Sequence, residues 1–356
     1  MAGEAPDIRG LLAALERPAS ALEVGGHAVR LTTLHRVYWP ADPALGQAAI
    51  TKRDLIGYLI RMSPLILPHL RDRPLTLFRW PAGIQGRRML QKHPESPLPP
   101  FVESVEIFSA TKGRDDTYVL CNNLATLVWL AEHGVLEIHV WHSRIRTRDR
   151  GRARSRPGGS AANLAASAVD FPDYMLFDLD PYIYAGSERP GAQPEPSERG
   201  IEAVKRVASW LRELLDGMGL RSCVKTSGKT GLHVAVPVEP TLRYDVVREV
   251  AKTLSQHLLR AHPGEITTEW DTRKRTGKIF IDFNMNVRGK SISAPYCPRG
   301  LPGAPVSMPL AWRELANAEP TQFRIPTVSM RGRRRDPWAA LDRPQSLERT
   351  LFATGG

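Results

Sequence analysis

Hydrophobic positions follow a helical period in some stretches of the chain and a strand period in others. Between 198 and 217, the apolar side chains Ile201, Val204, Ala208 and Leu211 recur every three or four residues, which is the spacing of one helix face. Short apolar or alternating runs bounded by Gly, Pro, Asn or Asp indicate strands instead. By these criteria, we predict a strand and turn at 30–40, strands at 73–80, 135–141, 174–180, 221–227, 232–238 and 278–284, and helices at 51–66, 122–134, 198–217 and 245–261.

The order of these elements carries information on the fold. From 174 onward it is strand-helix-strand-strand-helix-strand, the split βαβ or ferredoxin-like order. In that arrangement the first and last strands lie side by side. We therefore expect an α+β protein with a ferredoxin-like core and an N-terminal α/β module packed on it. The stretches 146–168 and 183–198 are rich in Arg, Gly, Ser, Ala or Pro and are predicted to be loops.

Two carboxylates end the apolar run YMLFDLD of the first core strand. Asp178 and Asp180 share one face of the strand, because side chains alternate with a period of two. Asp282 lies in the apolar run of the last strand, which the predicted order places next to the first. Two carboxylates so close together repel each other unless a positive charge neutralises them. Three carboxylates on adjacent strands form a hard oxygen cage that suits Mg²⁺ or Mn²⁺.

A glycine-containing turn joins the two middle strands. In TSGKTGLHV, residues 226–234, the two glycines permit a tight turn whose backbone N–H groups can face an anion. Ser227 and His233 add donors, and Lys225 and Lys229 add positive charge. An ordinary hairpin turn is the alternative, but beside an acidic metal site a phosphate-binding turn is favoured. The Walker A pattern GxxxxGK[ST] is absent from the sequence.

Composition restricts the classes of binding partner and the cellular compartment that we expect. The chain has 356 residues, of which 42% are hydrophobic and 24% charged, with a net charge of +12. Arginine clusters at 144–156 and 331–335 contribute to that charge and favour anionic partners such as nucleic acid, although an arginine-rich proteome would produce them too. The three cysteines form neither a disulfide framework nor a metal knuckle. No signal peptide or membrane-spanning run is found, so we expect a cytoplasmic protein.

The motifs DLDP, SGKTGLH and a later strand Asp, in this order, resemble those of the archaeo-eukaryotic primase superfamily. More closely, the chain is similar to the polymerase domain of bacterial ligase D, the end-joining repair enzyme. The resemblance covers about 28–350. Supporting stretches are RVYWP, TKRDLIGYL, RPLTLFRWPAGIQGRRMLQKH, NNLATLVWLAEHGVLEIHVW and DPWAALDRPQSL.

This resemblance implies a template-directed polymerase that adds nucleotides to a primer 3′-OH in gap filling or non-homologous end joining. It implies that Asp178, Asp180 and Asp282 are catalytic and hold two divalent ions, Mn²⁺ or Mg²⁺. The family often prefers ribonucleotides and Mn²⁺, although the sequence itself shows neither preference. The residues that the resemblance assigns to the nucleotide are Ser227, Lys229, His233, Arg299 and His139.

Basic residues of the N-terminal half match DNA contacts of the family. Lys52 and Lys92 correspond to residues that contact DNA, including a 5′-phosphate across a gap, and Arg36 and Arg79 are assigned to DNA as well. The implied partners are gapped or broken DNA, nucleoside triphosphates, a Ku-like end-binding protein and a separate DNA ligase, in the nucleoid. The chain contains no KxDG ligase motif, so we expect a stand-alone polymerase or an excised domain.

Several positions depart from the family pattern. Met89 and Leu90 replace two aromatic residues, Thr230 stands where a lysine is common, and Met285 replaces a glutamine. A weaker stack on the template base follows from the first change.

Two other functions remain open at this point. FDLDP also resembles the motif of haloacid dehalogenase-like phosphatases, but Tyr182 occupies a position where that motif has Thr or Ser. A nucleic-acid-binding module without catalytic activity is the non-enzyme alternative.

The predicted organisation is an N-terminal extension at 1–27, an α/β module at 28–145, a basic flexible loop at 146–170, the catalytic core at 171–310 and a C-terminal segment at 311–356. Residues 28–350 can also be counted as one domain.

Overall fold

The computed structural model describes residues 6–146, 155–183, 195, 197–319, 322–328 and 336–349. Contacts between residues divide the chain into two compact units. Unit 1 is Met1–Val140, Ile292–Val306 and Arg324–Arg334, and unit 2 is Trp141–Ser291, Ser307–Phe323 and Arg335–Gly356. The segment Ile292–Val306 thus groups with the N-terminal part, whereas the predicted core ran without interruption from 171 to 310.

Unit 1 contains a four-stranded sheet of order β15-β9-β5-β6, together with three two-stranded sheets, β1-β2, β3-β4 and β7-β8. Its helices are α1 Ile8–Leu15, α2 Lys52–Leu70, α3 Leu124–Glu132 and α7 Ile325–Val328. Its strands are β1 Ala21–Val24, β2 His27–Arg30, β3 Val37–Trp39, β4 Ile50–Thr51, β5 Leu75–Arg79, β6 Met89–Gln91, β7 Ser104–Ser109, β8 Arg114–Val119, β9 Val135–Trp141 and β15 Ser291–Ser293. The last residue of β9 and the first residue of β15 are assigned to unit 2.

Side-chain caps begin the two longest helices of unit 1. Thr51 Oγ1 accepts a hydrogen bond from Asp54 N at 3.3 Å, and Thr51 N donates to Asp54 Oδ2 at 2.7 Å, which is a capping box. Asn123 Oδ1 accepts from Thr126 N at 2.8 Å at the start of α3. Both predicted helix starts are confirmed. Helix α2 runs to Leu70, beyond its predicted end at 66.

Unit 2 is organised around a six-stranded sheet of order β13-β14-β10-β12-β11-β16. Its strands are β10 Tyr174–Pro181, β11 Cys223–Thr226, β12 Leu232–Pro237, β13 Ile266–Thr267, β14 Ile279–Asp282 and β16 Pro309–Leu310. Its helices are α4 Ala161–Ala166, α5 Glu198–Gly217 and α6 Tyr244–Ala261, with 3-10 turns η2 Ala168–Asp170, η3 Thr272–Arg275, η4 Phe283–Met285, η5 Trp312–Asn317 and η7 Pro337–Asp342.

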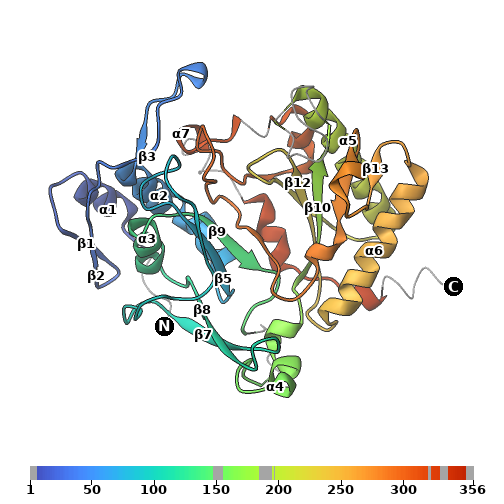
Figure 1. Ribbon diagram of the computed structural model, residues 1–356, viewed down its shortest axis with the longest axis horizontal. Helices are drawn as coiled ribbons and strands as arrows, with labels where there is room; N and C mark the ends of the chain where they lie inside the picture. Colours follow the sequence, from blue (N-terminus) through green and yellow to red (C-terminus); the bar gives the residue numbers. More distant parts are fainter. Residues whose placement is uncertain are drawn as a thin grey trace. The chain divides into compact units, whose positions relative to one another are not determined.

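Strand β10 lies inside this sheet, with β12 on one side and β14 on the other (Figure 1). Helices α5 and α6 both pack against β10. The side chains of Met175, Phe177 and Leu179 on one face of β10 are fully buried. The opposite face carries Asp178 and Asp180, which keep partial exposure. The predicted adjacency of the first and last core strands is therefore confirmed.

One predicted loop was partly wrong. Within 146–168, the described residues include helix α4, whose first turn is capped by the side chain of Ser160 accepting from Asn163 N at 3.1 Å. The four alanines and the leucine of AANLAA favour a helix, although the alanine-rich composition of the surrounding segment resembles that of a linker. The arginine cluster at 331–335 and most of the one at 144–156 lie outside the described residues.

Among the described helices, none combines the length and the apolar character that crossing a lipid bilayer requires.

Candidate active site

The three predicted carboxylates come together on the sheet of unit 2. In the antiparallel pairing of β10 with β14, Asp178 is opposite Asp282, and Asp180 is opposite Phe280. Residues directly opposite each other in such a pair lie on the same face. Asp178, Asp180 and Asp282 therefore project from one face of two hydrogen-bonded strands, although Asp178 and Asp282 are more than 100 positions apart in the sequence.

These carboxyl groups repel one another in a partly buried position. Burial, and then the charge of Asp178, raise the pKa of Asp180 to about 8. The same two causes raise the pKa of Asp282 to about 6. Lys229 opposes the shift at Asp180, and Lys290 opposes it at Asp282, without cancelling it. A divalent cation would remove this repulsion.

The donor set fits a hard cation, because it consists of carboxylate oxygens. Within the described parts of the chain, no group of three or more His, Cys, Asp or Glu side chains is already positioned to hold a metal ion. Asp282 Oδ1 accepts a hydrogen bond from Asn284 N at 2.9 Å. His233 Nε2 lies 3.2 Å from Asp178 Oδ1. The carboxylates thus share one face of the sheet but are not arranged as a closed metal cage.

The turn between β11 and β12 lies against the acids. A Cβ added at Gly231 would collide with the carbonyl oxygen of Leu179 and would lie 3.0 Å from Asp180 Oδ1, so only glycine allows this approach. Gly228 has φ +75°, a conformation that favours glycine. Ser227, His233 and the carboxylates are therefore brought together, as the sequence predicted.

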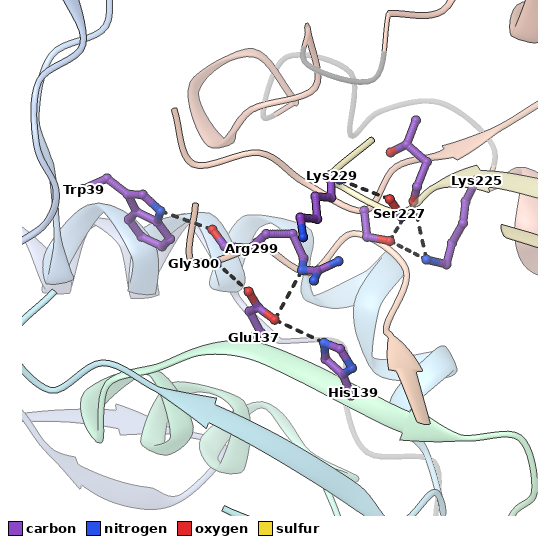
Figure 2. Close-up of polar contacts among 10 residues, drawn as sticks. Trp39, Glu137, His139, Lys225, Ser227, Lys229, Arg299 and Gly300 are labelled. Atoms are coloured by element: carbon purple, nitrogen blue, oxygen red, sulfur yellow. Dashed lines mark hydrogen bonds and ion pairs between the residues drawn. The ribbon is translucent and has the colours of Figure 1, made fainter. Parts of the chain in front are cut away.

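Two details of this turn differ from the prediction. The backbone N–H of Lys229 donates to Ser227 Oγ at 3.2 Å (Figure 2). The backbone N–H of Gly231 donates to the same oxygen at 3.2 Å, so both groups are engaged inside the turn. Lys225 is fully buried, donates to Ser307 Oγ and lies 5.5 Å from the centre of the Trp338 ring. Lys225 therefore supports the base of the hairpin and contributes no surface charge. This burial could not be predicted from the sequence, because Ser307 and Trp338 lie more than 80 residues further along the chain.

The two remaining predicted nucleotide residues belong to unit 1, and both contact Glu137. His139 Nε2 lies 3.2 Å from Glu137 Oε2, and Arg299 Nε lies 3.3 Å from the same oxygen (Figure 2). Gly300 N donates to Glu137 Oε1 at 2.9 Å. Burial would raise the pKa of Glu137, but the hydrogen bond from His139 and the charge of Arg299 lower it to about 2. The carboxylate is therefore ionised at neutral pH.

Sequence reasoning missed Glu137. The available signal was the alternation in EIH, which places Glu137 and His139 on one face of β9. An acid two residues before a strand histidine is a weak signal, and nothing in the sequence shows that Arg299 reaches the same carboxylate.

The predicted DNA-contacting residues are not equally accessible. Lys92 is exposed, Arg36 is exposed and donates to Pro81 O at 2.6 Å, and Arg79 donates to His133 O at 3.0 Å. Lys52, in contrast, is 3% exposed, and its Nζ lies 3.0 Å from Glu132 Oε1. A DNA phosphate could reach Lys52 only by displacing Glu132.

Comparisons with known proteins agree with this geometry. The model of the LigD primase-polymerase domain family matches residues 51–338. The chain belongs to this family. It is 31% identical over 339 residues to the multifunctional non-homologous end joining protein LigD of Pseudomonas aeruginosa, covering 94% of this chain and 35% of that protein. It is 29% identical over 280 residues to the bifunctional non-homologous end joining protein LigD of Bacillus subtilis, covering 78% of this chain and 39% of that protein.

A solved structure supports the same family assignment. The polymerase domain of Mycobacterium tuberculosis ligase D, in complex with DNA, matches with a TM-score of 0.72 and 27% identity, over 88% of this chain and 98% of that one. The chain spans between a third and two fifths of the length of the curated relatives quoted above. The family consists of primase-polymerases, which are nucleotidyltransferases that use divalent metal ions. Membership favours this chemistry over that of a dehalogenase-like phosphatase.

Proposed function

We propose that this chain is a template-directed polymerase of gap filling or non-homologous end joining, which adds nucleotides, ribonucleotides included, to a primer 3′-OH. The observation that carries the proposal is the register that pairs Asp178 with Asp282 and leaves Asp180 on the same face. Membership in the LigD primase-polymerase family supports it.

The proposed catalytic core is ferredoxin-like. The sheet order β14-β10-β12-β11, with α5 following β10 and α6 following β12, supports this description. Strands β13 and β16 then extend the core at its two edges. The sheet gives the acids a rigid support, since β10 is paired along both sides.

Asp178, Asp180 and Asp282 would hold two divalent ions, Mn²⁺ or Mg²⁺. When bound, such ions lower the pKa of the primer hydroxyl and neutralise the triphosphate and the leaving pyrophosphate. The protein contributes carboxylates whose mutual repulsion a cation relieves. His233, beside Asp178, supplies a donor at the edge of the acids.

Ser227, His233 and Arg299 are proposed to bind the triphosphate, and Lys229 and His139 are proposed to bind the incoming nucleotide. Lys229 is the cation that most opposes the raised pKa of Asp180, which supports its place beside the acids. The hydroxyl of Ser227 holds the turn in shape. It can still donate its own proton to a phosphate oxygen.

DNA is the proposed partner, bound in part through Lys92, Arg36 and Arg79. Lys52 would take part if the DNA phosphate displaces Glu132 from it. A net charge of +12 supports such a partner. The solved relative was obtained in complex with DNA. A Ku-like end-binding protein and a separate ligase would complete the repair reaction on the nucleoid, in the cytoplasm.

Primer extension on a gapped, 5′-phosphorylated duplex with Mn²⁺ tests the proposal. Wild-type protein should extend the primer according to the template, with rNTPs and dNTPs assayed in parallel. Asp178→Ala and Asp282→Ala should abolish extension and leave DNA binding largely intact. Asp173→Ala is the matched control, because Asp173 lies just before β10 and pairs with Arg144 at 3.0 Å.

The alternatives give different results in the same assay. A phosphatase would release phosphate from small esters without a template, and a binding module would shift DNA without extending it. Extension retained in either Asp178→Ala or Asp282→Ala would refute the proposed metal site.

A further inference from the structure

Two side chains that the proposed function assigns to the nucleotide share one buried carboxylate. Glu137 is 3% exposed, and its Oε2 is the atom that both His139 Nε2 and Arg299 Nε approach, at 3.2 and 3.3 Å. We propose that Glu137 is a positioning residue, which aims His139 and Arg299 at the incoming nucleotide. The inference rests on the proposed function, since it concerns how that function binds its substrate.

Glu137 determines the form in which His139 meets a ligand. An ionised carboxylate can only accept a hydrogen bond, so the contact at 3.2 Å requires the proton of the imidazole to be on Nε2. When the ring is neutral, Nδ1 is therefore the nitrogen that can accept. The Phe78 ring, whose centre lies 4.7 Å from that of His139 in an edge arrangement, limits the tilt of the imidazole. The orientation and tautomer of His139 are thus both set by its surroundings.

Glu137 also fixes Arg299, from two sides. Its Oε2 contacts the Arg299 side chain through Nε, and its Oε1 accepts from the next backbone N–H, that of Gly300, at 2.9 Å. Trp39 Nε1 donates to the Arg299 carbonyl oxygen at 3.2 Å (Figure 2). A Cβ on Gly300 would overlap the Trp80 ring, so this segment is held against two tryptophans. Arg299 is therefore held in place before any ligand arrives.

The partial exposure of the two cations is what a binding role requires. The side chains of His139 and Arg299 are 14% and 16% exposed, whereas that of Glu137 is 4% exposed. The carboxylate is thus covered, while both of its partners keep a solvent-facing part. The Glu137 carboxylate contacts an arginine, a histidine and a backbone N–H together. Preorganised donors bind an anion with less loss of side-chain freedom.

The test compares Glu137→Gln with wild type in primer extension by the full chain, with the nucleotide concentration varied. Glutamine has nearly the same volume and can still accept from Gly300 N, but it lacks the charge. We expect the nucleotide KM to rise by about 10-fold or more, the effect of losing a charge-assisted contact. We expect kcat and DNA affinity to change by less than about 3-fold, because the acids and the DNA contacts are untouched.

A double-mutant cycle separates positioning from general damage. If Glu137 acts through Arg299, then Glu137→Gln added to Arg299→Ala should raise KM by less than about 3-fold more, since coupled residues are not additive. Glu137→Asp, which keeps the charge but withdraws it by one methylene, is the second variant if the glutamine protein unfolds. It should raise KM as well.

Asp170→Asn is the matched control. Asp170 is also 3% exposed and also pairs with two arginines, Arg243 at 2.7 Å and Arg288. Its loss should lower the melting temperature and leave the nucleotide KM unchanged. A wild-type KM in folded Glu137→Gln, full additivity in the cycle, or an equal KM increase in Asp170→Asn would overturn the inference. Lack of extension by the wild type would instead overturn the proposed function.

Discussion

The side chain of Asn286 takes the place of a strand residue next to the candidate metal site. The ladder between β10 and β14 ends where Asp178 pairs with Asp282, and the chain then turns away through η4. Two residues before Asp178 on β10, Asn286 Oδ1 accepts from Leu176 N at 2.8 Å, and Asn286 Nδ2 donates to Leu176 O at 2.7 Å. One side chain thereby continues the pairing of β10 and anchors the segment that follows Asp282.

Asn286→Ala should therefore destabilise the protein markedly. Asn286 is 1% exposed, so its removal leaves the N–H and C=O groups of Leu176 without this partner in the interior. An unsatisfied buried polar group costs about 1–3 kcal/mol. Two such groups, partly rescued by an entering water molecule, give a loss of about 2–4 kcal/mol. Asn286→Asp keeps the acceptor but turns a carboxylate oxygen toward the Leu176 carbonyl, so we expect a loss of similar size.

Urea unfolding monitored by far-UV circular dichroism measures the loss of stability, and primer extension measures kcat. Extension should slow as well, because Asp282 loses its anchor four residues downstream. Asn284→Ala is the matched control: the Asn284 side chain accepts from Arg248 Nε at 2.9 Å at a half-buried position, and its backbone N–H to Asp282 survives the substitution. If the Asn286 and Asn284 variants lose equally little stability, the strand-replacement argument is wrong.

Three further predictions concern charge and close packing. In metal-free protein, the raised pKa values of about 8 for Asp180 and about 6 for Asp282 mean that these two groups bind more protons in the folded state than in the unfolded state. Their contribution to stability should therefore be greatest below about pH 4 and be lost as the pH rises to about 8. Thermal unfolding of wild type and Asp180→Asn with a chelator would measure this contribution as a difference, Mn²⁺ should stabilise wild type more at pH 8 than at pH 6, and a difference that does not change with pH would contradict the prediction. Gly231→Ala should lower the free energy of unfolding, measured with urea, by about 1–3 kcal/mol and suppress primer extension, because the added methyl group collides with the β10 backbone. Wild-type stability of this variant would contradict the prediction, because it would show that the turn can shift to accept the methyl group. Lys52→Ala should cost up to about 3–5 kcal/mol, because the Glu132 carboxylate loses its cation and keeps only the hydrogen bonds from Thr32. Lys92→Ala should leave the urea midpoint unchanged and reduce the salt dependence of DNA binding. Equal stability of the two lysine variants would argue against the buried pair.

Local patterns determined the main elements of this protein. Helix α5 has the bounds that its apolar spacing predicted, and the helices predicted to begin at 51 and 122 are capped by Thr51 and Asn123. These features depend on neighbours within four residues, which the sequence displays directly. The adjacency of β10 and β14 also followed from the sequence, because the predicted order of helices and strands restricts which strands can lie side by side.

Burial and long-range partners were decided only by the tertiary structure. Lys52 and Lys225 look like surface lysines in the sequence, but both are buried. Glu137 had no visible role until Arg299 and Gly300, more than 160 residues away, were seen to contact it. The environment of a charged side chain depends on which distant segments pack around it. Periodicity reports only which side of an element a residue occupies, so it could place the three carboxylates on one face but could not tell which cations remain free to meet a phosphate.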